Sequence, residues 1–219
     1  EAIITIREIA KIKYEEVFYK SPVPPTGIVE DFHENGQLKY RGNYIDGKQD
    51  GPWEWFDEDG NSTSTETYWN GVRDGLWEKF HENGQLAERG NYINGQQEGL
   101  WEEYHDDGKL EGRVNFIDSK QEGLLETFHD NGQLYVRGNF KDDESDGLWE
   151  EYYDDGQLFT KENYKDGERD GLWEEYYDNG QLAERGNYIN GQQEGLWEWF
   201  DEDGNLISTE TFRNGELVE

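Results

Sequence analysis

A glycine recurs every 24 residues along most of this 219-residue chain, with no insertion or deletion between the copies. Each copy opens a short run of apolar and charged residues, such as Gly75–Phe80. A fixed period of this length is typical of repeat arrays, in which each unit buries its apolar groups against its neighbours. The period therefore favours a long repetitive binding surface over a single catalytic pocket. The glycines are Gly27, Gly51, Gly75, Gly99, Gly123, Gly147, Gly171 and Gly195.

Two turn signals in each copy predict a β-hairpin. The first is Asn-Gly or Asp-Gly in all eight copies, from Asn35-Gly36 to Asp203-Gly204, and these dipeptides suit tight turns. The second is also Asn-Gly or Asp-Gly, except at Asp118-Ser119 and Asp142-Asp143. Strand, turn, strand and turn within 24 residues predict an all-β fold. We expect an elongated single-layer antiparallel meander of eight 24-residue β-hairpin repeats, with sixteen strands.

Alternation along each strand places large rings on both faces of this sheet. In Leu100–Tyr104, Leu100, Glu102 and Tyr104 share one face, and Trp101 and Glu103 share the other. A sandwich would instead have a uniformly apolar inner face, whereas a local bulge is an alternative that brings both ladders onto one face. The tryptophan ladder is Trp53, Trp77, Trp101, Trp149, Trp173 and Trp197, with Val29 and Leu125 at matching positions. The second ladder is Phe32, Phe56, Phe80, Tyr104, Phe128, Tyr152, Tyr176 and Phe200.

A period of 48 residues is superimposed on the shorter one. The motif Arg-Gly-Asn-Tyr/Phe occurs in alternate copies, at Arg41–Tyr44, Arg89–Tyr92, Arg137–Phe140 and Arg185–Tyr188. One interpretation is duplication of an ancestral two-hairpin unit. The other is that alternate hairpins pack differently, because the glycine lets a ring from the neighbouring strand lie close. Nearest-neighbour packing also predicts that Trp101, inside the array, contributes more than Trp197, near its end.

Residues 1–26 lie outside the period, and residues 27–219 hold the eight repeats. Several isoleucines and the proline-rich turn Ser21–Pro25 predict an N-terminal capping segment of one or two strands over the first sheet edge. A short helix near residues 3–16 is the alternative. The chain contains no methionine and begins at Glu1, which indicates a processed or trimmed product. On this basis an exported protein, periplasmic or extracellular, is slightly favoured over a cytoplasmic one.

The chain is strongly acidic, with 52 Asp and Glu residues, 20 Lys and Arg residues and a formal net charge of −32. Nucleic acid needs Lys and Arg for its phosphates, and an anionic membrane repels the same charge. A basic protein is therefore the expected partner, and the sequence sets no oligomeric state. Aromatic residues make up 15% of the chain and keep register with the repeat, which argues against the disorder that high charge suggests.

Residue types that carry chemistry are scarce. Four histidines share one repeat position with Asp and Tyr, so we interpret this position as an exposed strand end rather than a metal site. Asp57–Gly60 and Asp201–Gly204 lack the late glutamate of a calcium-binding EF-hand loop, which favours solvated turns. There is no thiol, nucleophile elbow or phosphate loop. We therefore predict no enzyme activity, no cofactor and no metal. The histidines are His33, His81, His105 and His129.

A glutamate follows the tryptophan position in all eight copies. Equivalent residues in successive hairpins lie two strand spacings apart, about 9.6 Å, where neighbouring charges repel by roughly 0.4 kcal/mol in water. One interpretation is a solvated face with local ion pairs, to which Arg89 and Arg185 contribute. The other is a row of carboxylates that binds a basic partner together with the tryptophans. That candidate surface comprises Glu54, Glu78, Glu102, Glu126, Glu150, Glu174, Glu198, Trp77, Trp101, Trp149 and Trp173.

The succession Gly-x-Trp-x-x-Tyr/Phe, Asn-Gly-Gln-Leu, Asn-Tyr and Asp/Asn-Gly resembles MORN repeats (membrane occupation and recognition nexus) in their bacterial variant form. The resemblance covers residues 26–219, and Pro25-Thr26-Gly27 is similar to the lead-in of bacterial members. It implies hairpins in an elongated sheet and a binding role. Bacterial members include antitoxin or immunity proteins paired with toxins, and exported proteins of the host interface. MORN arrays also occur attached to lipid kinases, but nothing in this chain resembles a kinase domain.

These observations lead to a non-enzymatic, acidic MORN-type repeat protein that mediates protein–protein interaction. One alternative is an antitoxin that neutralises a basic toxin, and another is an exported host-interface or structural repeat protein. The rival from a different class is a purely architectural spacer. A basic partner, captured in a salt-dependent way, would separate the binding roles from the spacer.

Overall fold

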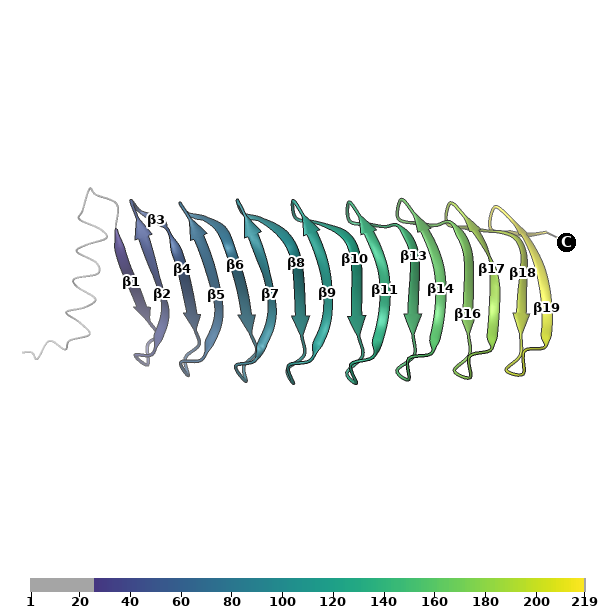
Figure 1. The fold of residues 1–219 in the computed structure, drawn as a ribbon, viewed down its shortest axis with the longest axis horizontal. Coiled ribbons are helices and arrows are strands. Elements are labelled where there is room, and N and C mark those ends of the chain that lie inside the picture. Colours follow the sequence, from purple (N-terminus) through teal and green to yellow (C-terminus); the bar gives the residue numbers. More distant parts are fainter. Residues whose placement is uncertain (1–25, 219) are drawn as a thin grey trace, which may run out of the picture. The chain divides into compact units, whose positions relative to one another are not determined.

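The computed structural model describes residues 26–218, and every regular element in this range is a β-strand of one antiparallel sheet. The predicted all-β meander of hairpins is confirmed. The predicted capping segment, residues 1–26, lies outside the described residues except for Thr26. The packing of the chain divides it into two compact units, each of which is a run of hairpins (Figure 1). Unit 1 consists of the chain up to Leu86 together with the segment Asn91–Gln96. Unit 2 consists of the segment Ala87–Gly90 together with the chain from Gln97 onward.

Each hairpin has a first strand, a second strand and, in some repeats, a short extra strand. The first strands are β1 (Gly27–Phe32), β4 (Gly51–Phe56), β6 (Val72–Phe80), β8 (Gln96–Tyr104), β10 (Lys120–Phe128), β13 (Gly147–Tyr152), β16 (Gly171–Tyr176) and β18 (Gln192–Phe200). The second strands are β2 (Leu38–Ile45), β5 (Ser62–Trp69), β7 (Leu86–Ile93), β9 (Leu110–Ile117), β11 (Leu134–Lys141), β14 (Leu158–Lys165), β17 (Leu182–Ile189) and β19 (Leu206–Arg213). The short strands are β3 (Lys48–Gln49), β12 (Glu144–Ser145), β15 (Glu168–Arg169) and β20 (Glu216–Val218).

The glycine that opens each repeat has a positive φ in all eight copies, from 74° at Gly99 to 127° at Gly27. Residues with a Cβ rarely adopt this conformation, which explains why the position is always glycine. Whereas β6, β8, β10 and β18 continue through this glycine, in three copies the strand is broken at the residue before it, so that β3, β12 and β15 are separated from the strands that follow. Together with β20, these short strands give twenty strands where the sequence predicted sixteen.

Both turn types match the sequence signals. In the first turn the amide of His33 donates to O of Gln37, and the amide of Gly36 donates to O of His33, both at 2.9 Å. In the second turn Asp46 and Gly47 have φ values of 49° and 77°, as a type I′ turn requires. The copies without glycine keep this conformation: Ser119 has a φ of 67° and Asp143 a φ of 70°.

The core lies on the face that carries the tryptophan ladder, here called the tryptophan face. Trp53 on β4 covers Gly42 on β2, where an added Cβ would lie 2.1 Å from the ring. Because no side chain fits beneath the ring, the glycine permits this packing, and the prediction that alternate hairpins pack differently is confirmed. We call these contacts glycine junctions. They are Gly42 with Trp53, Gly90 with Trp101, Gly138 with Trp149 and Gly186 with Trp197.

Three of the four tryptophans at glycine junctions are buried, and the fourth, Trp149, is half-buried. Trp53, Trp101 and Trp197 are 3%, 4% and 1% exposed. Trp197 lies between Trp173, at 5.6 Å between ring centroids, and Tyr188, at 5.2 Å. Trp197 is therefore buried as completely as Trp101 although it lies near the end of the array, which removes the reason for expecting a smaller contribution from it. It is buried because Gly186 lets its ring lie flat against the preceding strand.

Candidate functional site

The opposite face, here called the leucine face, carries the row of glutamates. Glu126 on β10 lies across from Arg113 on β9 and Arg137 on β11. Nε of Arg113 donates to the Glu126 carboxylate at 2.8 Å, and Nη2 of Arg137 lies 3.3 Å from its other oxygen. Glu126 is 6% exposed. A carboxylate at such a buried position is stabilised by the two cations that flank it.

Other glutamates of this row have cationic neighbours as well. Nε of Arg89 donates to Glu102 at 2.6 Å, and the predicted contribution of Arg89 to local ion pairs is confirmed. Arg185 donates in the same way to Glu198. Eight glutamates and six cations give the row a formal charge of −2, a small part of the total of −32. The six cations are Arg41, Arg89, Arg113, Arg137, Lys161 and Arg185, and Thr65 and Thr209 occupy the two remaining positions.

Contacts of the second ladder show which residues share a face. The hydroxyl of Tyr104 donates to Glu102 at 3.1 Å, so the second ladder lies on the leucine face with the glutamates. Trp53 and Trp55 have ring centroids 5.7 Å apart on the tryptophan face. The two ladders therefore lie on opposite faces, as residue alternation predicted, and no bulge brings them together.

The structure distributes the predicted candidate surface over both faces. Glu54, Glu78, Glu102, Glu126, Glu150, Glu174 and Glu198 lie on the leucine face, and Trp77, Trp101, Trp149 and Trp173 lie on the tryptophan face. Trp101 belongs to the buried core, whereas the other three tryptophans are half-buried. The eleven residues thus form two separate surfaces, and their role in binding stays a prediction.

A charged cluster around the buried Glu66 interrupts the tryptophan face, in a copy where glutamate occupies the glycine position of the Arg-Gly-Asn-Tyr/Phe motif. Glu66 accepts from Arg73 at 2.7 Å and from the hydroxyl of Tyr68 at 2.5 Å. The guanidinium group of Arg73 lies 5.4 Å from the centroid of the Tyr92 ring. Burial and the hydrogen bond to Glu66 raise the pKa of Tyr68 above its ordinary value, and Glu66 likewise raises the pKa of Arg73. Glu162 accepts from arginine and tyrosine in the same arrangement.

The raised pKa predicts a loss of stability at alkaline pH. Because the folded state favours neutral Tyr68, this contribution is fully present below the ordinary tyrosine pKa of about 10. It is lost as the pH rises through the higher pKa of the folded state. Titration by NMR with ring-labelled tyrosine measures this directly. We expect Glu66→Gln to lower the midpoint of Tyr68, and an unchanged midpoint would contradict the cluster.

The first turns are joined to one another by the position that holds His, Tyr or Asp. Nε2 of His33 donates to O of Phe56 at 2.9 Å, and the hydroxyl of Tyr153 donates to O of Tyr176 at 2.8 Å. His129 makes the equivalent contact. The side chains are half-buried, so the interpretation as an exposed strand end is wrong. The position accepts His or Tyr because both reach a carbonyl of the next hairpin.

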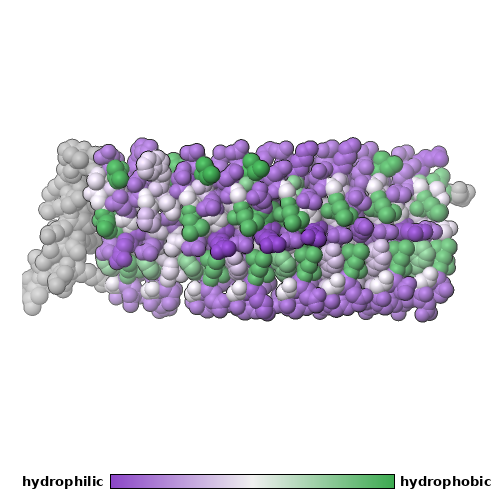
Figure 2. Space-filling view, in the orientation of Figure 1, coloured by the Kyte–Doolittle hydropathy of each residue, from purple (hydrophilic) through white to green (hydrophobic). Residues whose placement is uncertain are grey.

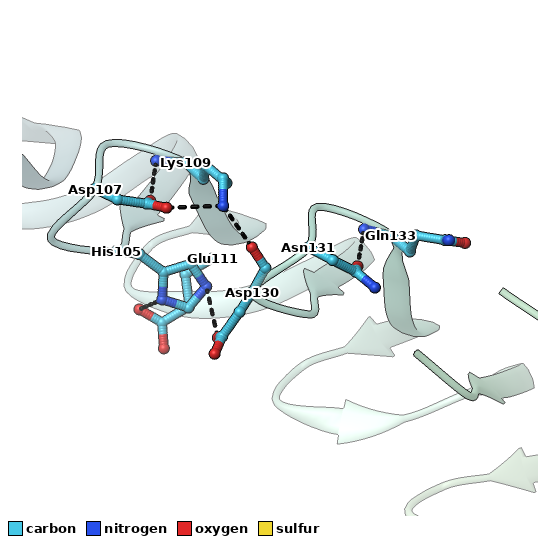
Figure 3. A network of polar contacts seen from close by, with 7 residues as sticks. All are labelled: His105, Asp107, Lys109, Glu111, Asp130, Asn131 and Gln133. Carbon is cyan, nitrogen blue, oxygen red and sulfur yellow. Dashed lines mark hydrogen bonds and ion pairs between the residues drawn. The ribbon is translucent and has the colours of Figure 1, made fainter. Parts of the chain in front are cut away.

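Figure 3 shows a second set of contacts between neighbouring first turns. Nζ of Lys109 lies 2.8 Å from Asp107 in its own turn and donates to O of Asp130 in the next turn at 2.7 Å. Nδ1 of His105 lies 3.6 Å from Glu111. These contacts join two neighbouring first turns of unit 2.

The hydrogen bonds inside each first turn are made by only some of its polar residues. The amide of Gln37 donates to the side-chain oxygen of Asn35 at 2.9 Å. In the next copy both the backbone amide and the side-chain amide of Asn61 donate to the Asp57 carboxylate. These bonds hold the pKa of Asp57 below its ordinary value. The turn conformation is thus explained without the acid that follows the His, Tyr or Asp position.

An Asp or Glu residue directly follows the His, Tyr or Asp position in all eight copies, and it is exposed in each of them. We call these residues the turn-tip acids. No single motif in the sequence reveals the row, which becomes apparent only when the copies are aligned on the 24-residue period. The turn-tip acids are Glu34, Glu58, Glu82, Asp106, Asp130, Asp154, Asp178 and Glu202.

The whole edge formed by the first turns is acidic. Their five-residue segments contain fourteen Asp and Glu residues and one lysine, Lys109. Within residues 26–218, no three His, Cys, Asp or Glu side chains are grouped as a metal site would need. The same range contains no helix long and apolar enough to span a membrane.

Among solved structures, this chain resembles parts of larger proteins. It is 13% identical to "Crystal Structure of TarM", covering 65% of this chain and 25% of that one, with a TM-score of 0.30. It is 17% identical to "Crystal structure of GtfA/B complex bound to UDP and GlcNAc", covering 56% and 26%, with a TM-score of 0.23. This chain thus spans about a quarter of the length of each. No curated protein matches the chain.

A family described as MORN repeat variant matches eight consecutive segments of the chain. Each match spans the first strand, the first turn and the second strand of one hairpin, so the family period coincides with the structural repeat. The matched residues are 25–46, 49–70, 73–94, 97–118, 121–142, 145–166, 169–190 and 193–214. The resemblance to MORN repeats is confirmed, and this chain belongs to the MORN repeat variant family.

Proposed function

We propose that this protein is a non-enzymatic repeat protein that binds a basic protein through the edge formed by its first turns. The observation that carries this proposal is the row of turn-tip acids, which is acidic in every copy and exposed in every copy. The turn's own hydrogen bonds use other residues, such as Asn35 and Asp57. An acid at this position in all eight copies therefore supports a role beyond the turn conformation, and the carboxylate of Asp130 also lies 3.9 Å from Nε2 of His105.

Spacing makes the row act as a continuous field. Successive turn-tip acids within a unit are about 9.6 Å apart, two strand spacings. This is close to the Debye length of about 8 Å at physiological ionic strength, so the fields of neighbouring acids overlap. An edge of one charge sign attracts an oppositely charged partner and raises its association rate. The glutamates of the leucine face contribute less, because six cations lie between them.

The tryptophans of the candidate surface have a different part in this proposal. Trp77, Trp149 and Trp173 are half-buried, so they offer ring surface to a partner that reaches the tryptophan face. Trp101 holds neighbouring strands together. An antitoxin acting on a basic toxin, and an exported binding protein, are two settings in which the same acidic edge serves.

A pair of variants matched in net charge tests the proposal. The turn-tip variant carries Asp106→Asn, Asp130→Asn, Asp154→Asn and Asp178→Asn. The ladder variant carries Glu102→Gln, Glu150→Gln, Glu174→Gln and Glu198→Gln. Each removes four negative charges from the same region of the chain, so any difference between them reports where the charge lies.

The probe is a fluorescent peptide of about 20 Lys and Arg residues, whose association rate is measured by stopped flow. At an ionic strength of about 0.01 M we expect the turn-tip variant to associate at least about threefold more slowly than the wild-type protein. The ladder variant should stay close to the wild-type rate. Equal losses in both variants would show that only net charge matters and would contradict the assignment to the first-turn edge.

A further inference from the structure

The leucine face of unit 2 carries a row in which leucine and asparagine alternate from strand to strand. Leu124 on β10 lies directly across from Asn139 on β11, and Leu172 on β16 lies across from Asn187 on β17. Residues directly opposite in an antiparallel pair project on the same face. We call this set the Leu–Asn row. It comprises Leu100, Asn115, Leu124, Asn139, Leu148, Asn163, Leu172, Asn187 and Leu196.

The row presents both apolar and hydrogen-bonding groups to solvent. Its five leucines are between 38% and 54% exposed. The side-chain amides of Asn115, Asn139 and Asn187 make no hydrogen bond within residues 26–218. Figure 2 shows hydrophobic bands running beside a hydrophilic one over the strands. An exposed carboxamide can donate to and accept from a peptide backbone, and the leucines beside it offer apolar contacts for side chains.

The period of the row selects the conformation of its occupant. Leucines of successive hairpins are about 9.6 Å apart. A polyproline II helix advances about 3.1 Å per residue, so every third residue recurs at about 9.3 Å. An α-helix advances about 10.5 Å in seven residues. Over the four intervals between Leu100 and Leu196, the repeat of the polyproline II helix departs from the leucine spacing by about 1.2 Å in total, and that of the α-helix by about 3.6 Å. The polyproline II segment therefore stays in register and the α-helix does not.

Charge beside the row selects the composition of the occupant. The four five-residue segments that begin with the second turns contain ten Asp and Glu residues and two cations, Lys120 and Arg169. These segments are residues 118–122, 142–146, 166–170 and 190–194. On the other side of the row lie the glutamates with their cations, as between Glu126 and Arg113. The acidic side is thus the one formed by the second turns. A segment lying on the row meets an excess of negative charge and is favoured when it carries Lys or Arg.

We propose that the Leu–Asn row binds a basic polyproline II segment of the partner, with an apolar residue at every third position over the leucines. The amides of Asn115, Asn139 and Asn187 bond the segment's backbone, which in this conformation has no internal hydrogen bonds, whereas Nδ2 of Asn163 already donates to O of Leu172. This rests on the proposed function in taking the partner to be basic. It adds a second contact surface and a sequence pattern that the partner must have.

The probe is a fluorescent peptide of five Leu-Lys-Pro triplets, with a control peptide of the same composition whose leucines are irregularly spaced. We expect the triplet peptide to bind the wild-type protein at physiological salt at least about tenfold more tightly than the control. Equal binding would overturn the proposal. So would tighter binding of a basic amphipathic peptide with one leucine per heptad, because that result identifies an α-helix as the occupant.

Variants of the row supply the second measurement. We expect binding of the triplet peptide to weaken at least about tenfold in a variant that combines Leu124→Gln, Leu148→Gln and Leu172→Gln. Asn139→Ala with Asn187→Ala should weaken it by about fivefold for each lost hydrogen bond. As a matched control, Leu206→Gln with Ile207→Gln replaces exposed apolar residues away from the row and should change nothing. A row variant that binds like the wild-type protein would contradict the proposal.

The two proposals fail in distinguishable ways. If the row variant binds the Lys–Arg peptide as weakly as the turn-tip variant does, the Leu–Asn row is not a separate surface. If the turn-tip and ladder variants are equal but the row variant loses the triplet peptide, the first-turn proposal fails and the row stands. Circular dichroism of each variant confirms that the sheet is retained.

Discussion

Replacing Gly186 by valine is expected to destabilise the protein by about 3 kcal/mol or more, one of the two largest effects anticipated for a single substitution. A Cβ at this position would lie 2.2 Å from ring carbons of Trp197, and the backbone beneath the ring is part of β17. The ring must therefore leave the position in which it is 1% exposed. Urea denaturation followed by far-ultraviolet circular dichroism measures the loss.

Two controls make this result specific to the glycine junction. At Gly112, also within a second strand, an added Cβ lies 3.3 Å from Thr127 and 3.5 Å from O of Glu126, so Gly112→Ala should cost less than about 1 kcal/mol. In a Trp197→Ala background Gly186→Val should lose most of its effect, since the clashing ring is gone. If Gly186→Val costs the same with and without the ring, the clash with Trp197 is not its cause.

Trp197→Ala is the second large effect, with an expected loss of about 3–5 kcal/mol. Trp197 packs against the rings of Trp173, Tyr188 and Phe212, with centroid distances between 5.2 and 6.1 Å. Trp173→Ala should cost less, because Trp173 is half-buried and β14 presents Glu162, not glycine, at the corresponding place. Denaturation of both variants compares them directly. Equal losses, or a larger loss for Trp173→Ala, would contradict the alternation of junctions.

The sequence was sufficient for the repeat, the hairpins and the two faces, because each depends on local spacing. Glycine at every twenty-fourth position and Asn-Gly turns determine strand lengths, and alternation along Leu100–Tyr104 assigns the faces. The sequence did not reveal that Gly51 has a φ of 79°. Glycine is compatible with that conformation but also with ordinary strand geometry.

The candidate site was harder to predict, because its properties depend on contacts between hairpins. A row of glutamates is acidic in sequence, but the pairing of Glu126 with Arg113 and Arg137 appears only once cross-strand register is known. The half-burial of His33 depends on its contact with Phe56, which is 23 residues away. The turn-tip acids were visible in the sequence, yet their exposure distinguishes them from the paired glutamates only in the structure.

We propose that an acidic edge, rather than net charge alone, recruits a basic protein. Affinity capture from the native source tests it, with the wild-type protein, the turn-tip variant and the ladder variant compared at about 0.01 M and about 0.15 M ionic strength. We predict that one basic protein is captured by the wild-type protein and the ladder variant, and that the turn-tip variant retains much less of it. Equal retention of that protein by all three, at both ionic strengths, would contradict the claim.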